Sequence, residues 1–336
     1  MTETTSTSLT PARSEVERAV AFGVRAPSIH NTQPWRWIYR PGVLELNADR
    51  SRQLPALDPD GRSLLLSCGA ALELARLGFA TTGWPTEVDR LPDPDHPDLL
   101  ARIHTLGRTA VQPATVERAK AAERRRTERR PFLVEPVADE AIRSLLAAAT
   151  DVGSYAYAVQ RADEQLDLAV VFSWADSVEM SEPAYRAELA HWTHAADAPD
   201  GVPAAAIPHV SAGAPRHTDV PVRDFEAGIT GGLQLTEAVD ERPLYIVLFS
   251  VTDDRLARLR AGEAYARISV EAERLGLASS AMTQAVDLPA IRERFRMLMD
   301  WPDHPQMVLR VGHPRLGPIP PPTGRRPLAA VFQFEE

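Results

Sequence analysis

Apolar residues recur at helical spacing in four stretches of the chain. Val16, Val20 and Val24 stand four positions apart, which predicts a helix from about Ser14 to Arg25. Leu and Ala dominate residues 62–80 on nearly every face, so this long helix is expected to lie buried. The same spacing predicts amphipathic helices at residues 139–149 and 256–276.

Shorter apolar runs predict strands. They lie at residues 35–39, 43–46, 166–171, 245–251 and 307–311. Residues 104–120 lack a comparable pattern, and we expect them to connect two halves of the chain.

Residues 191–232 follow neither periodicity. Several prolines interrupt the stretch, among them Pro203, Pro208, Pro215 and Pro221, with Gly, Ala and His between them. A loop of this length inside a compact protein is usually functional or disordered. Each proline fixes its φ angle, so we expect a stiff segment.

The two long helices carry a repeated sequence. Residues 73–82 read ELARLGFATT and residues 271–280 read EAERLGLASS, with Glu, Arg, Leu, Gly and Ala at identical spacing. Internal repetition indicates a duplicated architecture, although chance similarity of Ala- and Leu-rich helices is the alternative. We therefore expect one half at residues 1–118 and a second at 119–336.

Composition limits the classes of function that this chain can have. The 336 residues are 44% hydrophobic and 25% charged, with a formal net charge of −9 that favours neither nucleic-acid nor membrane binding. A single cysteine, Cys68, excludes an intrachain disulfide and fits a reducing cytoplasm. The polar N-terminus shows no secretory signal, and the longest strongly apolar run, 244–251, is too short to span a bilayer. A cytoplasmic protein, as a monomer or weak dimer, is the expectation.

The most specific motif is APSIHNTQPW at residues 26–35. Pro27 and Pro34 both break helices, so the motif could simply be a helix stop and a turn. A functional interpretation is that Ser28 and Asn31 offer polar groups to the rim of a heteroaromatic ring. His30 is interpreted as either a ring contact or a plain loop residue, with the latter slightly favoured.

A basic run, RRRTERRPF, follows at residues 124–132. It could be a solvated helix end. Alternatively, guanidinium groups bind phosphate oxygens in bidentate fashion, and a Thr hydroxyl adds a neutral donor, so the run could clamp a phosphate dianion.

Both motifs resemble the flavin mononucleotide (FMN) site of the nitroreductase family. The basic run with Pro136-Val137 resembles that family's entry motif, and APSxxNxQPW resembles its flavin-contacting loop. By pattern the chain is similar to the fused-dimer, Acg-type group of actinobacterial NAD(P)H nitroreductase-like proteins, which is associated with dormancy. The resemblance implies an α+β fold: a pseudo-dimer of two nitroreductase-like halves, with mixed β-sheets around long buried helices.

The resemblance also implies a set of FMN-binding residues and no catalytic side chain. The turn at 278–281 corresponds to the one beside the flavin atom that receives hydride, and the closing segment GRRPL at 324–328 corresponds to one that reaches the phosphate. The implied contacts are Pro27, Ser28, Asn31, Arg125, Arg126, Thr127, Arg129, Ser279, Ser280, Arg325 and Arg326.

The distribution of the motifs predicts one FMN per chain. The first half keeps the Pro-Ser-x-x-Asn loop and the second keeps the arginines, whereas the counterpart loop at 151–155 reads DVGSY. The inserted segment 191–232 is predicted to be a lid that covers the flavin, so that the protein stores or sequesters it. An active NAD(P)H-dependent reductase of small nitroaromatic or quinone substrates is the first alternative. A flavin-free binding or structural protein is a more remote one, and His191 and His194 leave a metal enzyme as the least favoured.

Overall fold

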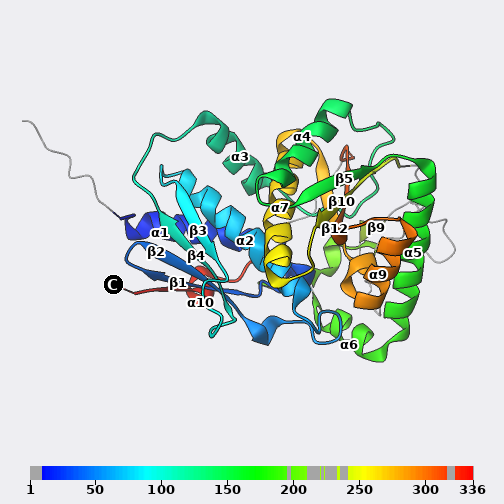
Figure 1. The fold of residues 1–336 in the computed structure, drawn as a ribbon, viewed down its shortest axis with the longest axis horizontal. Coiled ribbons are helices and arrows are strands. Elements are labelled where there is room, and N and C mark those ends of the chain that lie inside the picture. The colour runs from blue at the N-terminus through cyan, green and yellow to red at the C-terminus, as the bar shows by residue number, and fades with distance from the viewer. Residues whose placement is uncertain are drawn as a thin grey trace, which may run out of the picture.

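A computed structural model describes residues 10–194, 198–209, 220, 223, 233–234, 241–315 and 322–335. Two β-sheets stand on either side of a central helix pair, α2 (Arg62–Ala80) and α7 (Arg255–Arg274) (Figure 1). The pair crosses closely at Gly69, where an added Cβ would lie 2.0 Å from the carbonyl oxygen of Leu259. Only a glycine allows the two backbones to meet at this distance. The first copy of the repeated sequence, residues 73–82, covers the end of α2, and the second, residues 271–280, covers the end of α7 and the start of β11.

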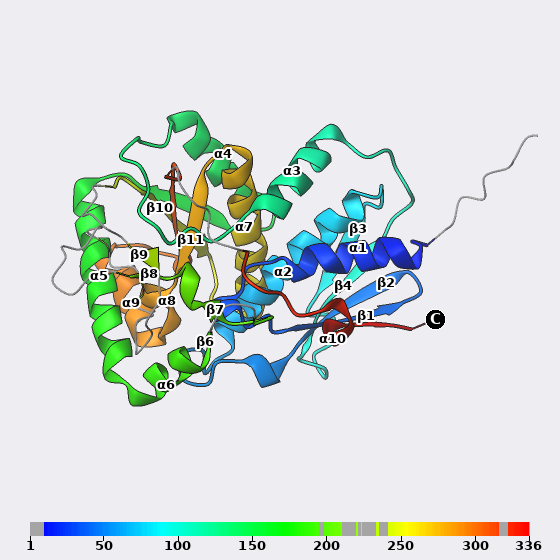
Figure 2. The same cartoon turned by 180° about the vertical axis from the view of Figure 1, so that it is seen from behind.

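The first sheet belongs mostly to the N-terminal half. Its strand order is β13-β1-β2-β4-β3, antiparallel except that β13 runs parallel to β1. Figure 2 shows the end of the chain, with α10 (Leu328–Val331) and β13, returning to this sheet. The C-terminal residues 322–335 are thereby brought to the loop that precedes β1. The strands are β1 (Trp35–Arg40), β2 (Val43–Ala48), β3 (Thr86–Arg90), β4 (Leu99–Thr105) and β13 (Phe332–Phe334).

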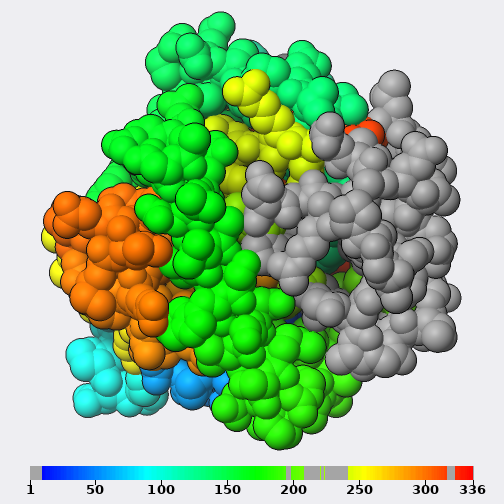
Figure 3. Space-filling view, turned by 90° about the vertical axis from the view of Figure 1, so that its right-hand side faces the viewer, coloured from blue at the N-terminus to red at the C-terminus, as the bar shows by residue number. Residues whose placement is uncertain are grey.

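The second sheet is antiparallel, in the order β11-β12-β10-β5. One core cluster packs α4 and α7 with this sheet, and a second packs α5, α8 and α9 with it. Figure 3 views the molecule from the side that α5 (green) and α9 (orange) cover. The strands are β5 (Tyr155–Val159), β10 (Leu244–Ser250), β11 (Ala278–Met282) and β12 (His304–Gly312). The remaining helices are α1 (Arg13–Val24), α3 (Pro113–Arg124), α4 (Asp139–Thr150), α5 (Ala162–Ser181), α6 (Pro183–His191), α8 (Gln284–Asp287) and α9 (Pro289–Leu298).

The strand predicted at residues 166–171 is wrong. These residues lie inside α5, where Leu168, Phe172 and Ala175 are buried at helical spacing. A six-residue stretch with five apolar residues fits a buried strand and a helix equally well. The stretch alone does not show that a helix continues to Ser181. The expected connection at 104–120 contains the start of α3, which begins at Pro113.

The segment 191–232 is only partly within the described residues. Its described parts form two short parallel pairings, β6 (Thr193–His194) with β7 (Val202–Pro203) and β8 (Pro208–His209) with β9 (Leu233–Gln234), with a 3-10 turn at Ala204–Ala206. The predicted lid otherwise falls on residues 195–197, 210–219, 221–222 and 224–232, which lie outside the described residues.

Helix α2 is the one described helix that is long and apolar enough to cross a membrane, and 78% of that stretch is buried inside the protein. It packs against α1 and α7, as the sequence pattern predicts for a core helix.

Candidate functional site

The loop between α1 and β1 has an unusual backbone. Three of its non-glycine residues have positive φ angles: His30 at 43°, Asn31 at 54° and Gln33 at 51°. The hydroxyl of Ser28 accepts a hydrogen bond from the Gln33 amide at 3.0 Å, and the hydroxyl of Ser67 on α2 accepts one from the Ile29 amide at 3.1 Å. Left-handed residues of this kind cost free energy and cluster at functional sites.

Asn31 joins this loop to two distant segments. Its Nδ2 donates to the carbonyl oxygens of Gly201 at 3.0 Å and Gly324 at 3.1 Å, and its Oδ1 accepts from Arg325 at 3.1 Å. Both amide hydrogens are thus engaged within the protein, and a ligand would find only the second lone pair of Oδ1. The predicted contact between Asn31 and flavin stays a prediction.

Gln33 reinforces the same junction. Its Nε2 donates to the carbonyl oxygen of Pro199 at 2.8 Å, and its Oε1 accepts from the Arg326 amide at 2.8 Å. Residues 31–33, 199–201 and 324–326 therefore form a three-way junction held by side-chain amides.

Arginines from distant parts of the chain gather around one cavity. Arg125 is only 9% exposed, its Nη2 donates to the Arg25 carbonyl oxygen at 3.2 Å, and its Nε has no hydrogen-bond partner among the described residues. The Nε of Arg325 also lacks one there. The arginines lining this cavity, which we call the arginine cavity, are Arg25, Arg125, Arg126, Arg129 and Arg325.

The arginine cavity favours an anion, because its five arginines outnumber the two carboxylates that also line it, Glu123 and Glu128. Burial, reinforced by the charges of Arg125, Arg25 and Arg126, lowers the pKa of Arg325 to about 9. Burial also lowers the pKa of Arg129 to about 10 and that of Arg125 below its usual value. Cations that are destabilised by burial and by one another gain free energy when an anion arrives. The unused donors would then form charge-assisted hydrogen bonds.

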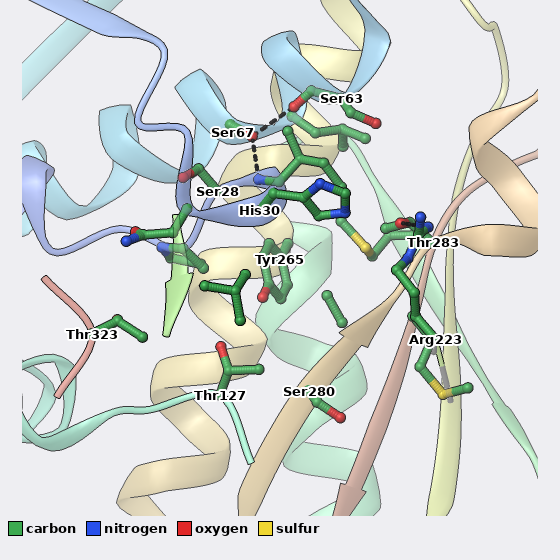
Figure 4. Close-up of a pocket in the computed structure, with 18 of the residues that line it drawn as sticks. Ser28, His30, Ser63, Ser67, Thr127, Arg223, Tyr265, Ser280, Thr283 and Thr323 are labelled. Atoms are coloured by element: carbon green, nitrogen blue, oxygen red, sulfur yellow. Dashed lines mark hydrogen bonds between the residues drawn. The ribbon is translucent and has the colours of Figure 1, made fainter. Parts of the chain in front are cut away.

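A second cavity, which we call the main cavity, adjoins the first. The two share Thr127, Arg129, Thr323 and Arg325 among their lining residues. Figure 4 shows Thr127 and Thr323 at one side, Arg223 at the other, and His30 and Tyr265 between them. Helices α2 and α7, the loop before β1, strand β11 and Arg223 all contribute to its walls.

His30 points into the main cavity and is 6% exposed. Burial, followed by the charges of Arg223 and Arg129, holds the pKa of His30 well below its usual value. The imidazole is therefore neutral at physiological pH and can offer one donor and one acceptor.

Arg223 fixes the far side of the main cavity. Its Nη2 donates to Asp287 at 2.6 Å, its Nη1 lies 3.3 Å from the Glu179 carboxylate, and its guanidinium lies over the Tyr185 ring. Burial raises the pKa of Glu179 to about 7, although Arg223 opposes the shift. One described residue of the segment 191–232 is thus tied to α5, α6 and α8.

The structure brings most of the sequence-predicted residues together. Pro27, Ser28, Asn31, Thr127, Arg129, Ser280 and Arg325 line the main cavity, and Arg125 and Arg126 line the arginine cavity.

Ser279 and Arg326 line neither cavity. The Ser279 carbonyl oxygen accepts from the Glu128 amide at 2.9 Å, so this residue positions the basic run through its backbone. Arg326 binds Gln33 and, at 3.4 Å, Asp49, and so supports the loop.

Sequence reasoning missed several lining residues. The polar or aromatic ones include Ser63 and Ser67 at the start of α2, Tyr265 on α7, and Arg223, Thr283, Gln284 and Thr323. The only hint in the sequence for Ser63 and Ser67 is that they carry hydroxyls within an otherwise apolar helix. In the described part of the chain no group of three or more His, Cys, Asp or Glu side chains could hold a metal.

Comparison with known proteins gives sequence relatives over nearly the whole chain. No family model matches. Among solved structures with partial likeness are a nitroreductase with bound FMN from Desulfitobacterium hafniense (13% identity, TM-score 0.40, 66% of this chain and 98% of that chain) and NfrA2 of B. megaterium (15% identity, TM-score 0.39, 65% and 73%).

Two proteins of Mycobacterium tuberculosis are much more similar in sequence. One, named "Putative NAD(P)H nitroreductase", is 37% identical over 334 residues, covering 97% of this chain and 93% of that protein. The other, "Putative NAD(P)H nitroreductase acg", is 33% identical over 320 residues, covering 94% and 95%. The chain therefore belongs to the NAD(P)H nitroreductase-like family that these mycobacterial proteins represent.

Proposed function

We propose that the chain binds one FMN between its two halves, with the phosphate in the arginine cavity and the ring system in the main cavity. The observation that carries this proposal is the pair of adjoining cavities, one lined by five arginines and the other by polar groups around Tyr265. A phosphate ester on a flat, polar-edged ring matches such a pair.

The residues present fit FMN in three respects. The Nε groups of Arg125 and Arg325 are buried donors with no described hydrogen-bond partner, as a phosphate site requires. The Ser280 hydroxyl is likewise buried without a described partner and faces the main cavity. Thr127, shared by both cavities, provides a neutral hydroxyl where the ribityl chain or phosphate would pass.

One site per chain follows from where these residues lie. The loop at 26–35 comes from the first half, and Arg125, Thr127 and Arg129 come from the second. The counterpart of the loop, residues 151–155, lacks the Pro-Ser-x-x-Asn pattern. The symmetry-related position would therefore hold no second flavin.

An oxidoreductase role rests on the family. When bound, FMN supplies a two-electron carrier, and the protein supplies binding, orientation and electrostatics. Arg125 and Arg325 would hold the phosphate end, while His30 and Ser280 would contact the ring end. The names of the relatives make NADH or NADPH the proposed electron donor. Small nitroaromatics or quinones are the acceptors that we propose.

Restricted access to the flavin is the second part of the proposal. Val202 and Arg223 line the main cavity and Ala206 lines the arginine cavity, so described parts of the segment 191–232 contribute to both. The junction at Asn31 and Gln33 holds residues 199–201 beside the cofactor loop. We infer that this segment slows the exchange of flavin and the approach of nucleotides, so that the protein stores FMN and turns over slowly.

The flavin content of the purified protein tests the proposal directly. Denaturation should release a yellow ligand with the mass of FMN, in a ratio near one per chain. Two flavins per chain would contradict the single site. Flavin adenine dinucleotide, or a colourless protein that fails to bind added FMN, would contradict the cofactor.

A further inference from the structure

One end of the main cavity carries a hydroxyl pair with a fixed orientation. The Thr283 hydroxyl donates to Asp287 Oδ2 at 2.7 Å, and the Ser63 hydroxyl donates to Asp287 Oδ1 at 3.2 Å. Both residues line the cavity, whereas Asp287 is 5% exposed and stands behind them. Because an ionised carboxylate can only accept, each hydroxyl hydrogen is committed to Asp287. The two hydroxyl oxygens therefore offer the cavity lone pairs only.

The residue after Thr283 adds a donor to the same cavity. Gln284 lines the cavity, is 1% exposed, and its Nε2 has no hydrogen-bond partner among the described residues. A buried amide N–H left unpaired costs about 1–3 kcal/mol. An unpaired donor in the same cavity as two fixed acceptors indicates that a ligand completes the set.

We propose that Ser63, Thr283 and Gln284 form a subsite for a primary carboxamide, and that its occupant is the nicotinamide group of NADH or NADPH. This subsite rests on the proposed oxidoreductase function and adds the residues that recognise the electron donor. A carboxamide has two N–H hydrogens and one carbonyl oxygen, which matches two acceptors and one donor.

The flavin ring carries the competing group. Its imide edge presents two carbonyl oxygens around a single N–H, so it needs two donors around one acceptor. The subsite has the reverse arrangement, with two acceptors and one donor. The arginine cavity, which would hold the FMN phosphate, adjoins the main cavity at Thr127 and Thr323, on the other side from Arg223 in Figure 4.

Asp287 and Arg223 act as positioning residues for this subsite. Arg223 Nη2 donates to Asp287 at 2.6 Å and to the Thr283 hydroxyl at 3.2 Å. Thr283 thus keeps one free lone pair, and its orientation is set from two sides. A site that hydrogen-bonds a substrate group rejects analogues lacking that group, because its own polar atoms are then left unpaired.

The test uses the FMN-loaded full chain and two reduced dinucleotides. NADPH carries the carboxamide, and its 3-acetylpyridine analogue replaces the amide nitrogen with a methyl group and so loses both N–H donors. The wild-type protein should prefer NADPH in kcat/KM for flavin reduction. Thr283→Val should reduce that preference about two- to tenfold by weakening NADPH alone, the effect of one hydrogen bond. Thr283→Ser should restore the preference.

Equilibrium binding gives a readout independent of turnover. The dissociation constants of NADP⁺ and of its acetylpyridine analogue, measured by calorimetry on the loaded protein, should converge in Thr283→Val and in Ser63→Ala. FMN affinity should stay unchanged in both. Thr109→Val, at an exposed loop position, is the matched control for the loss of a Thr hydroxyl.

Three results overturn the proposal. Equal losses for both dinucleotides would show that Thr283 does not recognise the amide. A loss of FMN affinity without a change in nucleotide discrimination would assign the subsite to the flavin imide and leave the FMN proposal standing. Failure of the FMN-loaded wild-type protein to bind either dinucleotide would exclude a nicotinamide subsite. Failure to bind FMN would refute the proposed function by itself.

Discussion

Replacing Arg125 by methionine should weaken FMN binding while leaving the apoprotein folded. Arg125 is 9% exposed, and its side chain makes one described hydrogen bond, to the Arg25 carbonyl oxygen at 3.2 Å. Methionine keeps the length of the apolar stem and removes the charge and the donors. The substitution therefore separates anion binding from packing.

The structure sets the expected size of both effects. A hydrogen bond to a charged group contributes about 1.5–3 kcal/mol, so losing the phosphate contact should lower FMN affinity about tenfold to hundredfold. The apoprotein loses one hydrogen bond of about 1 kcal/mol. It is also relieved of repulsion, since the charges of Arg125, Arg25 and Arg126 all help to lower the pKa of Arg325. We expect these terms to offset each other, with the free energy of unfolding changing by less than about 1 kcal/mol.

The assay is a titration of apoprotein with FMN, followed by flavin fluorescence, together with urea unfolding of the same samples. Arg124→Met is the matched control, because Arg124 is the preceding residue, is exposed, and pairs with Glu273 at 3.0 Å instead of lining the cavity. The reasoning is refuted if Arg125→Met retains wild-type affinity. It is also refuted if Arg124→Met reproduces the loss, because a general change in charge would then explain it.

Three further predictions concern the supports of the site. Burial raises the pKa of Glu179 from its ordinary value near 4.5 to about 7. Between these pH values the folded state keeps a proton on Glu179 that the unfolded state has released. The free energy of unfolding should therefore fall as the pH rises from about 5 to about 7. Glu179→Gln should abolish about 2–3 kcal/mol of this pH-dependent loss, measured by urea unfolding. An unchanged dependence of the unfolding free energy on pH would show that Glu179 is not the cause. A Cβ on Gly324 would lie 1.9 Å from the Ala198 carbonyl oxygen, so Gly324→Ala should open the Asn31 junction and speed FMN release. Gly107→Ala is the control, because an added Cβ there has nothing within 4 Å. Equal release rates for the two variants would count against the junction. Replacing residues 195–222 by a short Gly/Ser linker should raise the rate of flavin reduction by NADPH in anaerobic stopped-flow. Equal rates for the intact and shortened proteins, with FMN retained in both, would refute the lid.

The sequence predicted the two long buried helices well, because their apolar pattern is local and strong. Residues 62–80 are apolar on most faces and form α2 at those bounds, and the repeat at 271–280 spans the end of α7 and the start of β11. The mistaken strand at 166–171 shows the limit of such reasoning. Its apolar run was shorter than the helix that contains it, and only the packing of α5 against α8 and α9 reveals the helical face.

The residues of the candidate site were likewise predicted only where the sequence signal is local. Motifs with fixed spacing, such as the loop at 26–35 and the basic run, led to residues that line the two cavities. The sequence could not supply residues that reach the site through tertiary structure. Ser63 becomes relevant only because α2 begins beside the loop, and Thr283 only because β11 ends there. No short-range pattern connects two hydroxyls that are 220 positions apart with the carboxylate they share.

Asn31 shows why a correct position does not settle a role. The motif placed this residue at the site, and the structure puts it among the lining residues of the main cavity. Its amide hydrogens nevertheless bind Gly201 and Gly324, at 3.0 and 3.1 Å, and its backbone has a φ of 54°. A side chain cannot donate the same hydrogens to the flavin and to the two segments at once. If FMN takes one of them, the junction must release a segment, so occupancy of the main cavity and closure of residues 199–201 are coupled through one amide group.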